Sequence, residues 1–477
     1  MWLRWFAVCV AALLCAHALA ASATGNRVLV LADEPSAYSK WVDALHERGY
    51  SVAVHKADQP PEHGLYEYGE RKYDHVALFA PAMKEFPENM PAQALVKFLQ
   101  DGGNMLVALS SELSETWRAF AREFSLEFAQ RETMLVDHFG YEKRIDRGDH
   151  TAVKLCGASA LPRGGPLDVP VFRKSTREQC SATPFVYRGV AHWVGPNPLA
   201  FSLIAPPLSS YETDVPQISG SGAQWTASGI DAIEPLYEAR APLVGADAYT
   251  ADATASLASA LQLRDNSARA VFVGSTEVFG RLYAPGVQRA VVDDLVAWTF
   301  QEYGVLAVER TAHERVAADA HDVRPEYEEE PGAAHMYRIK DTVAFSIDVS
   351  AFDGEWKPAP RDLDLQVSFV MLDPYVTVPL RATETVEGER PATRYAAQLR
   401  LPDRHGVFSF KVNWKRHGLS YIVTSDNVPV RPYNHDEYPR MLSSSWPYVS
   451  GAFSTIAAFV VFVAVWLCLP DGKSKTA

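Results

Sequence analysis

A long uncharged stretch near the carboxyl end constrains this sequence more than any other feature. No Asp, Glu, Lys, Arg or His occurs between Arg440 and Asp471, and residues 448–469 are mostly apolar. A helix of about 22 residues is roughly 33 Å long, enough to cross a hydrocarbon core about 30 Å thick. A buried core helix, the alternative, is rarely free of charge over such a length. We therefore predict a transmembrane helix at residues 448–469.

The two ends of the chain predict its orientation. Residues 1–23 combine one positive charge, an apolar run and small residues, which is typical of a signal peptide cleaved near Ala20 or Ala23. Residues 470–477 form a short tail with Lys473 and Lys475, as expected on the cytosolic side of a membrane. The bulk of the chain would then be lumenal or extracellular, as in a type I membrane protein.

The two tail lysines also have a specific spacing. They occupy the fifth and third positions from the carboxyl end, a pattern similar to the retrieval signal of endoplasmic reticulum membrane proteins. Two ordinary positive-inside lysines would give the same pattern, so both interpretations stay open.

Small residues gather in the first half of the predicted span. Ser450, Ser454 and Ala458 recur every four residues and would share one side of a helix, with Gly451 beside them. Small side chains let helices approach closely in lipid, so we predict that this stripe packs against other membrane helices. A generic anchor without a preferred side is the alternative.

The composition between signal and span is that of a globular protein. The chain is 48% hydrophobic and 22% charged, and its formal net charge of -13, with no basic block, argues against a nucleic-acid partner. Cys156 and Cys180 are the cysteines outside the signal and the span. In an oxidising lumen they could form a disulfide, or they could remain two free thiols.

The pattern of apolar residues predicts two lumenal domains. Strand-like apolar runs alternate with amphipathic helices over residues 27–305, which predicts an α/β doubly wound domain of flavodoxin or amidotransferase type. Within it, residues 126–263 follow no regular order and are predicted to be an insertion or second lobe. Residues 306–332 are acidic and predict a linker. Residues 333–440 alternate with period two and predict a β-sandwich-like domain followed by a juxtamembrane segment.

Enzyme motifs are weak in this sequence. The turn after the first predicted strand, Asp33-Glu34-Pro35, is bulky and anionic, which argues against a dinucleotide phosphate. Ser110 and Ser111 follow another strand without the glycines of a nucleophile elbow. Asp137-His138 suggests a metal site but is more typical of a hydrogen-bonding pair. Paired carboxylates for glycoside cleavage have no sequence signature and stay open. We predict no catalytic residue, no cofactor and no metal ligand.

Short stretches along nearly the whole chain after the signal have a distinctive order. They are residues 28–33, 68–70, 73–75, 79–81, 98–104, 136–138, 187–190, 372–375, 401–408, 430–432, 437–438 and 446–448. Each stretch is weakly specific alone, but together with the terminal span they resemble one family, the 48 kDa subunit of the oligosaccharyltransferase complex. The chain departs from the family at Glu34, where many relatives have Asn, and at Trp446 and Val449.

The resemblance implies a non-catalytic accessory subunit in the endoplasmic reticulum membrane, needed for assembly and stability of the complex. In that family a separate multi-span subunit holds the active site and its divalent metal, and it transfers a lipid-linked oligosaccharide to asparagine. The implied partners are that catalytic subunit, ribophorin-like subunits and small multi-span subunits. The resemblance leaves open an indirect contact with the lipid-linked oligosaccharide or the nascent chain. The alternatives are a membrane-anchored lumenal hydrolase, which would depend on Ser110 or Ser111, and a receptor-like ectodomain.

Overall fold

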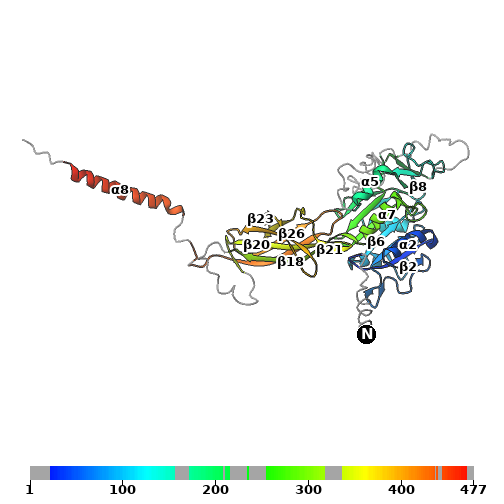
Figure 1. Ribbon diagram of the computed structural model, residues 1–477, viewed down its shortest axis with the longest axis horizontal. Helices are drawn as coiled ribbons and strands as arrows, with labels where there is room; N and C mark the ends of the chain where they lie inside the picture. Colours follow the sequence, from blue (N-terminus) through cyan, green and yellow to red (C-terminus); the bar gives the residue numbers. More distant parts are fainter. Residues whose placement is uncertain are drawn as a thin grey trace, which may run out of the picture.

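The computed structural model describes residues 22–155, 171–207, 210–214, 234–235, 254–316, 336–435, 437–438 and 443–469. A mixed α/β part is followed by a sheet-rich part and by one long apolar helix (Figure 1). The predicted signal peptide and cytosolic tail lie outside the described residues, except that Ser22 and Ala23 are described.

The α/β part is built on a seven-stranded sheet with strand order β12-β16-β17-β6-β5-β1-β2. Strands β2, β1, β5, β6 and β17 pair in parallel, whereas β16 pairs antiparallel with both β17 and β12. Side chains of β1 alternate between two separate cores, because both faces of the sheet are covered. The strands are β1 (Arg27–Ala32), β2 (Ser51–Lys56), β5 (His75–Phe79), β6 (Asn104–Ala108), β12 (Ala200–Ile204), β16 (Ala258–Gln262) and β17 (Arg269–Val273).

Helices lie on the two faces of this sheet. On one face, α2 (Ser39–Glu47) and α7 (Val287–Thr299) contribute Trp41 and Trp298 to the core that holds Val28 and Val30. On the other face, α3 (Ala92–Gln100) and α4 (Glu115–Arg122) pack on the core that holds Leu29 and Leu31. The parallel pairing and the two covered faces confirm the predicted mixed α/β domain.

The irregular middle segment is only partly a separate insertion. Its strands β12 and β16 join the main sheet as antiparallel neighbours, so this portion continues the α/β core and is not a second lobe. Hydrophobic periodicity could not identify them, since such short apolar pieces fit many arrangements. The remaining elements are η1 (Pro35–Tyr38), β3 (Tyr66–Glu67), β4 (Glu70–Arg71), β7 (Leu126–Phe128), β8 (Thr133–Val136), β9 (Val153–Leu155), α5 (Lys174–Ala182), β10 (Phe185–Tyr187), β11 (His192–Val194), β13 (Tyr211–Asp214), β14 (Glu234–Pro235) and β15 (Thr254–Ser256).

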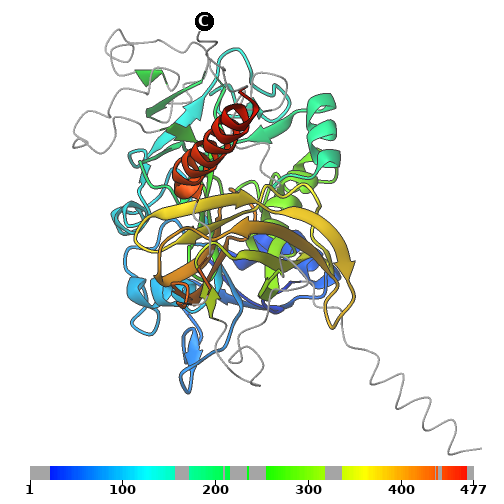
Figure 2. The same cartoon turned by 90° about the vertical axis from the view of Figure 1, so that its left-hand side faces the viewer.

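The sheet-rich part consists of two five-stranded sheets around one core, which includes Phe345 of the first sheet and Phe410 of the second. In Figure 2 its yellow and orange strands lie in front of the α/β part. The first sheet contains β18 (Tyr303–Arg315), β20 (Thr342–Asp353), β21 (Glu355–Pro358), β24 (Arg381–Val386) and β25 (Ala392–Arg400). The second contains β19 (Tyr337–Arg338), β22 (Gln366–Val370), β23 (Pro374–Pro379), β26 (Gly406–Trp414) and β27 (Ile422–Arg431).

The predicted acidic linker at residues 306–332 is wrong in its first third. Residues 303–315 form β18, which pairs along its length with β20. Leu306 joins the core, and Glu309 accepts a hydrogen bond from Ser350 Oγ over 2.5 Å. The charged residues Glu309, Arg310, Glu314 and Arg315 misled the prediction, because an antiparallel strand with one solvated face can also carry charge. Residues 317–335 lie outside the described chain.

The carboxyl-terminal helix α8 (Trp446–Cys468) follows the short η5 (Ser443–Ser445). An 18-residue stretch within residues 443–468 has a mean hydropathy of 2.2, and the helix is long and apolar enough to cross a membrane. This confirms the predicted single apolar helix near the carboxyl end.

Candidate functional site

His75, from one of the family-like stretches, lies at the amino end of the parallel strands. Its Nε2 donates a hydrogen bond to the Gly25 carbonyl over 2.8 Å, and its Nδ1 accepts one from Asn104 Nδ2 over 3.2 Å. The ring stacks on Phe300 with centroids 4.4 Å apart. Burial lowers the pKa of His75 to about 4, so the ring is neutral at neutral pH.

Asp74 and Asn104 extend this polar cluster across the sheet edge. Asp74 accepts hydrogen bonds from the Arg27 backbone N, Nε and NH2 groups at 3.0, 3.0 and 2.8 Å. Although burial opposes it, this pairing lowers the pKa of Asp74. Asn104 Oδ1 accepts from the Arg269 backbone N over 2.9 Å and from Gln301 Nε2 over 3.0 Å. The cluster therefore connects the first residues of β1, β5, β6 and β17.

Arg269 continues the cluster toward the sheet-rich part. Its buried guanidinium donates to the carbonyls of Trp298, Tyr303 and Gly304 at 2.7, 2.9 and 2.7 Å. It also lies over the Trp298 ring, 4.5 Å from the centroid. Burial lowers the pKa of Arg269 to about 9, which leaves the side chain charged at neutral pH. The Arg269 guanidinium thus binds the carbonyl groups between the end of α7 and the start of β18.

The loop between β26 and β27 adds further hydrogen bonds at this place. We call the hydrogen bonds of Arg269, together with those between this loop and Trp298, Gln262 and Gly304, the joint. Trp298 Nε1 donates to the Gly418 carbonyl over 2.8 Å, and Gln262 Nε2 donates to the Leu419 carbonyl over 2.9 Å. The Ser420 backbone N donates to the Gly304 carbonyl over 3.0 Å. A Cβ on Gly304 would lie 2.7 Å from the Gly418 oxygen. The α/β and sheet-rich parts meet here, side by side in Figure 1.

The carboxyl ends of parallel strands are where sheets of this type bind ligands. At this edge, burial raises the pKa of Asp33, and the nearby carboxylates of Asp58 and Glu112 add to the rise. Ser110 Oγ accepts a hydrogen bond from the Glu112 backbone N over 3.3 Å. Among the described residues, no hydrogen bond joins Ser110 to a histidine or another base. Ser110, one of the two candidate nucleophiles, therefore forms no nucleophile–base pair among the described residues.

The Asp137-His138 pair forms local hydrogen bonds. Asp137 Oδ1 accepts from the backbone N of Phe139 and Gly140 at 2.9 and 3.0 Å. His138 Nε2 lies 2.5 Å from the Tyr211 hydroxyl. Within the described ranges there is no group of three or more His, Cys, Asp or Glu side chains that could hold a metal ion. The geometry fits the hydrogen-bonding interpretation of the pair.

Of the two cysteines predicted to form a disulfide, the structure describes only one. Cys180 lies on α5, is 8% exposed and is not a free thiol. Cys156 lies outside the described residues. The Cys156–Cys180 disulfide therefore stays a prediction.

The small residues of α8 are all exposed on the helix surface. Ser450 Oγ donates to the Pro447 carbonyl over 3.0 Å, and Ser454 Oγ donates to the Gly451 carbonyl over 2.8 Å. Both hydroxyls are thus satisfied within the helix, as a lipid environment requires. Ala458 lies one turn further on. Lys473 and Lys475 lie outside the described residues, so their role stays a prediction.

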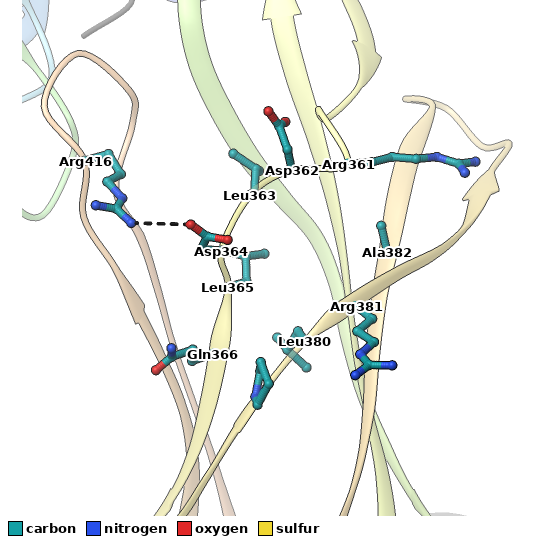
Figure 3. Close-up of a pocket in the computed structure, with 11 residues that line it drawn as sticks. Arg361, Asp362, Leu363, Asp364, Leu365, Gln366, Leu380, Arg381, Ala382 and Arg416 are labelled. Carbon is teal, nitrogen blue, oxygen red and sulfur yellow. Dashed lines mark ion pairs between the residues drawn. The ribbon is translucent and has the colours of Figure 1, made fainter. Parts of the chain in front are cut away.

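A surface pocket of about 590 Å³ lies where the chain crosses from β23 to β24 (Figure 3). Leu363, Leu365 and Leu380 contribute apolar surface to it, and three arginines line it. Arg416 lies 3.7 Å from Asp364, with both side chains mostly exposed. No cofactor or metal chemistry is indicated by this set of side chains.

Sequence reasoning did not identify the joint or this pocket. One signal for the joint was available, because Arg269 places a charge at the start of an otherwise apolar strand run. A buried charge needs partners, so such a residue predicts a polar contact near its position. The carbonyl of Gly418 and the pocket arginines carry no comparable signal.

Two known domain families match the sequence of this chain. The OST48 N-terminal domain family matches residues 19–302, and the OST48 middle domain family matches residues 321–470. The chain belongs to the OST48 family. The first match ends at residue 302, directly before β18 and the joint.

Curated OST48 relatives match along nearly their whole length. The chain is 29% identical to the Schizosaccharomyces pombe dolichyl-diphosphooligosaccharide–protein glycosyltransferase subunit wbp1, covering 98% of this chain and 97% of that one. It is 30% identical to the 48 kDa subunit of Arabidopsis thaliana, covering 93% of each. It is 29% identical to the 48 kDa subunit of Danio rerio, covering 94% and 93%. The resemblance drawn from short stretches is confirmed.

Proposed function

We propose that this chain is a non-catalytic accessory subunit of an oligosaccharyltransferase complex, which transfers a lipid-linked oligosaccharide to asparagine in protein N-glycosylation. Its relatives in a fungus, an animal and a plant are named as subunits of that glycosyltransferase. The single observation that carries the proposal is the match to both OST48 domains over nearly the whole chain. Its role is to assemble and stabilise the complex.

The position of the family-like residues supports the non-catalytic part of this proposal. Asp74, His75 and Asn104 lie at the amino ends of the strands, opposite the edge where parallel sheets bind substrates. Their polar atoms are occupied by hydrogen bonds to other parts of the chain. These residues maintain the fold and the joint, and the chemistry would belong to the separate multi-span subunit.

The α/β domain is proposed to be of the flavodoxin-like type. Its parallel strands, numbered by order along the chain, have the spatial order 2-1-3-4-5, which is the arrangement of that type. We place the domain boundary at residue 302, because β18 belongs to the sheet-rich domain. That domain, with two sheets around one core, is proposed to be a β-sandwich.

The membrane topology is proposed to be that of a single-pass type I protein of the endoplasmic reticulum, with both folded domains in the lumen. Cleavage of the signal after Ala20 fits the fold better than cleavage after Ala23. Ser22 is 1% exposed, and the Ala23 backbone N donates to the Gln301 carbonyl over 3.1 Å.

Substitution of both Lys473 and Lys475 by serine should let chains without partners leave the early secretory pathway. Unchanged retention would mean that the tail is only a positive-inside flank.

The small-residue stripe of α8 is proposed to pack against partner helices. Replacing Gly451 and Ser454 by leucine keeps the helix apolar but prevents a partner helix from approaching it closely. Fewer partner subunits should co-purify with this double variant than with a control that has leucine at Val461 and Val465. Equal recovery would indicate an anchor without a preferred side.

The central experiment is purification of the tagged full-length chain from membranes in a mild detergent. Mass spectrometry should find the catalytic multi-span subunit and ribophorin-like subunits in defined proportion to the chain. A chain that purifies alone, from cells in which the other subunits are present, would contradict the proposed function.

A further inference from the structure

The end of the β-sandwich from which the chain continues to α8 carries exposed apolar side chains. Strand β27 ends there, and its register with β26, and that of β26 with β22, bring the start of β26 and the turn between β22 and β23 to the same end. The joint lies at the opposite end, so we call this one the α8 end (Figure 1). Leu372, in the turn, is 91% exposed, and Val407, on β26, is 66% exposed. Beside them, the Tyr375 ring packs edge-on against Phe408 with centroids 5.5 Å apart.

Leu372 contributes little to the fold itself. The preceding side chain, Met371, packs against the core of the sandwich, whereas Leu372 belongs to none of the three cores formed by the described residues. The turn that carries Leu372 is held by the pairing of β22 with β23 and with β26. Single exposed apolar side chains are ordinary on protein surfaces, so the meaning of Leu372 depends on what lies next to the α8 end.

The length of chain between the sandwich and α8 limits what can lie there. Glu437 is fixed to the α8 end, because its carboxylate accepts hydrogen bonds from Arg431 NH1 and NH2 at 2.6 and 2.7 Å and from Arg338 NH1 at 3.4 Å. Five residues separate Glu437 from Ser443, the first residue of η5, which leads directly into α8. Six fully extended steps of chain cover at most about 22 Å. The α8 end of the sandwich therefore lies within about this distance of the start of the apolar helix.

A lipid surface fits this gap, whereas a folded domain of another protein does not. A domain of about 100 residues has a radius of gyration of about 13 Å and is therefore about 30 Å across, more than the connecting chain can span. Trp446 and Tyr448, at the start of α8, are exposed aromatic side chains of the kind that lie in the interfacial layer of a membrane. Leu372 lies two strand spacings, about 10 Å, from β27, so the tether that brings Glu437 near this layer brings Leu372 near it too.

The charges at the α8 end indicate which lipids it suits. Lys340 and Asp403 form an ion pair over 2.7 Å, and Asp373 directly follows Leu372. The pair offsets its own charges and Asp373 repels anionic headgroups, so an electrically neutral phospholipid is the matching class. Because α8 holds the sandwich beside the bilayer, the effective concentration of lipid at the turn is high, and a small apolar contact is enough to bind.

We infer that the α8 end of the sandwich rests on the phospholipid surface from which α8 emerges, with Leu372 inserted in the interfacial layer and Val407 and Tyr375 at its edge. A single helix joined by a short chain leaves the folded domains free to swivel above the membrane. A second point of contact removes this freedom and sets the height and tilt at which the two domains stand. The inference rests on the proposed membrane topology and goes beyond it, since it assigns a lipid-binding surface to a folded domain.

The test measures contact between the turn and lipid in the full-length chain, reconstituted in phosphatidylcholine vesicles. Asp373→Cys carries a fluorescent label beside the intact Leu372, and Gly388→Cys carries the same label in the β24–β25 turn at the opposite end of the sandwich. Both are made with Cys468→Ala, which removes the free thiol of α8. Phosphatidylcholine with a nitroxide on its acyl chain should quench the label at position 373 and leave the label at position 388 unquenched.

A second pair of variants tests the role of the leucine itself. Leu372→Ser should lower the ratio of lipid-bound to free turn by about tenfold, because burial of a leucine side chain contributes at least this factor. Val423→Ser is the matched control, since Val423 is an exposed apolar side chain of the same sheet close to the joint. It should leave the quenching at position 373 unchanged. Because Leu372 and Val423 are both exposed, neither substitution should change the unfolding temperature, and Leu372→Ala provides a second variant if Leu372→Ser does.

Three outcomes would overturn the inference. The first is equal quenching at positions 373 and 388 in vesicles that retain the chain after alkaline extraction, which leaves the proposed function and topology intact. The second is a chain that alkaline extraction releases from the vesicles, in which case the proposed topology fails and the inference fails with it. The third is a photo-crosslinker at position 373 that, in native membranes, links the chain to one other protein and not to lipid, which would assign the turn to a protein partner.

Discussion

The joint between the α/β and sheet-rich parts predicts an unusually large effect for Trp298→Phe. The substitution removes the indole N–H that donates to the Gly418 carbonyl over 2.8 Å in a buried position. A buried carbonyl left without its donor costs about 1–3 kcal/mol. The smaller ring also weakens the interaction with the Arg269 guanidinium, which is worth about 0.5–2 kcal/mol. Both losses come in addition to the reduced volume of the side chain.

Trp41→Phe is the matched control, because it makes the same change in volume without these two losses. Trp41 is 1% exposed in the same domain, and its Nε1 has no hydrogen-bond partner among the described residues. Denaturant unfolding of the full-length chain in detergent should show a loss about 2 kcal/mol greater for Trp298→Phe than for Trp41→Phe. Limited proteolysis should also cut the Trp298→Phe variant faster between the domains. Equal destabilisation by the two substitutions would refute the account of the joint.

Three further predictions concern other parts of the chain before α8. His75 has a folded pKa of about 4 against 6.5 when unfolded, so stability should be complete above pH 6.5 and fall by about 3 kcal/mol as pH decreases through 4. A His75→Gln variant should lose that pH dependence in urea unfolding, and an unchanged profile would contradict the assignment. Gly274→Ala places a Cβ 2.1 Å from the Val190 oxygen and should destabilise the chain by about 1–3 kcal/mol, whereas Gly388→Ala, whose nearest atom is at 3.7 Å, should be nearly neutral in thermal unfolding. Peptide mapping of the non-reduced protein should link Cys156 to Cys180, and recovery of both as free thiols would exclude the disulfide.

Long periodic elements were predictable from the sequence because local pattern and tertiary environment agree there. Residues 28–32 of the first strand are apolar throughout and are indeed buried on both faces. The transmembrane helix was predictable for the same reason, since length and absence of charge leave few alternatives. By contrast, β18 carries the adjacent charged pairs Glu309-Arg310 and Glu314-Arg315, which resemble a linker, and only its partner strand β20 reveals it as part of a sheet. Pairing over such a distance along the chain leaves no local signal.

The contacts that join the domains were beyond prediction for a related reason. The acceptor for Trp298 is a backbone carbonyl, and every residue has one, so no side chain marks Gly418 as a partner.

The position of the family-like stretches argues for an architectural function of this chain. If Asp74, His75 and Asn104 served a ligand of the α/β domain, they would be expected at the carboxyl ends of the strands. They lie at the amino ends instead, and their hydrogen bonds lead through Arg269 to the joint. The same cluster therefore stabilises the α/β core and fixes the sandwich against it.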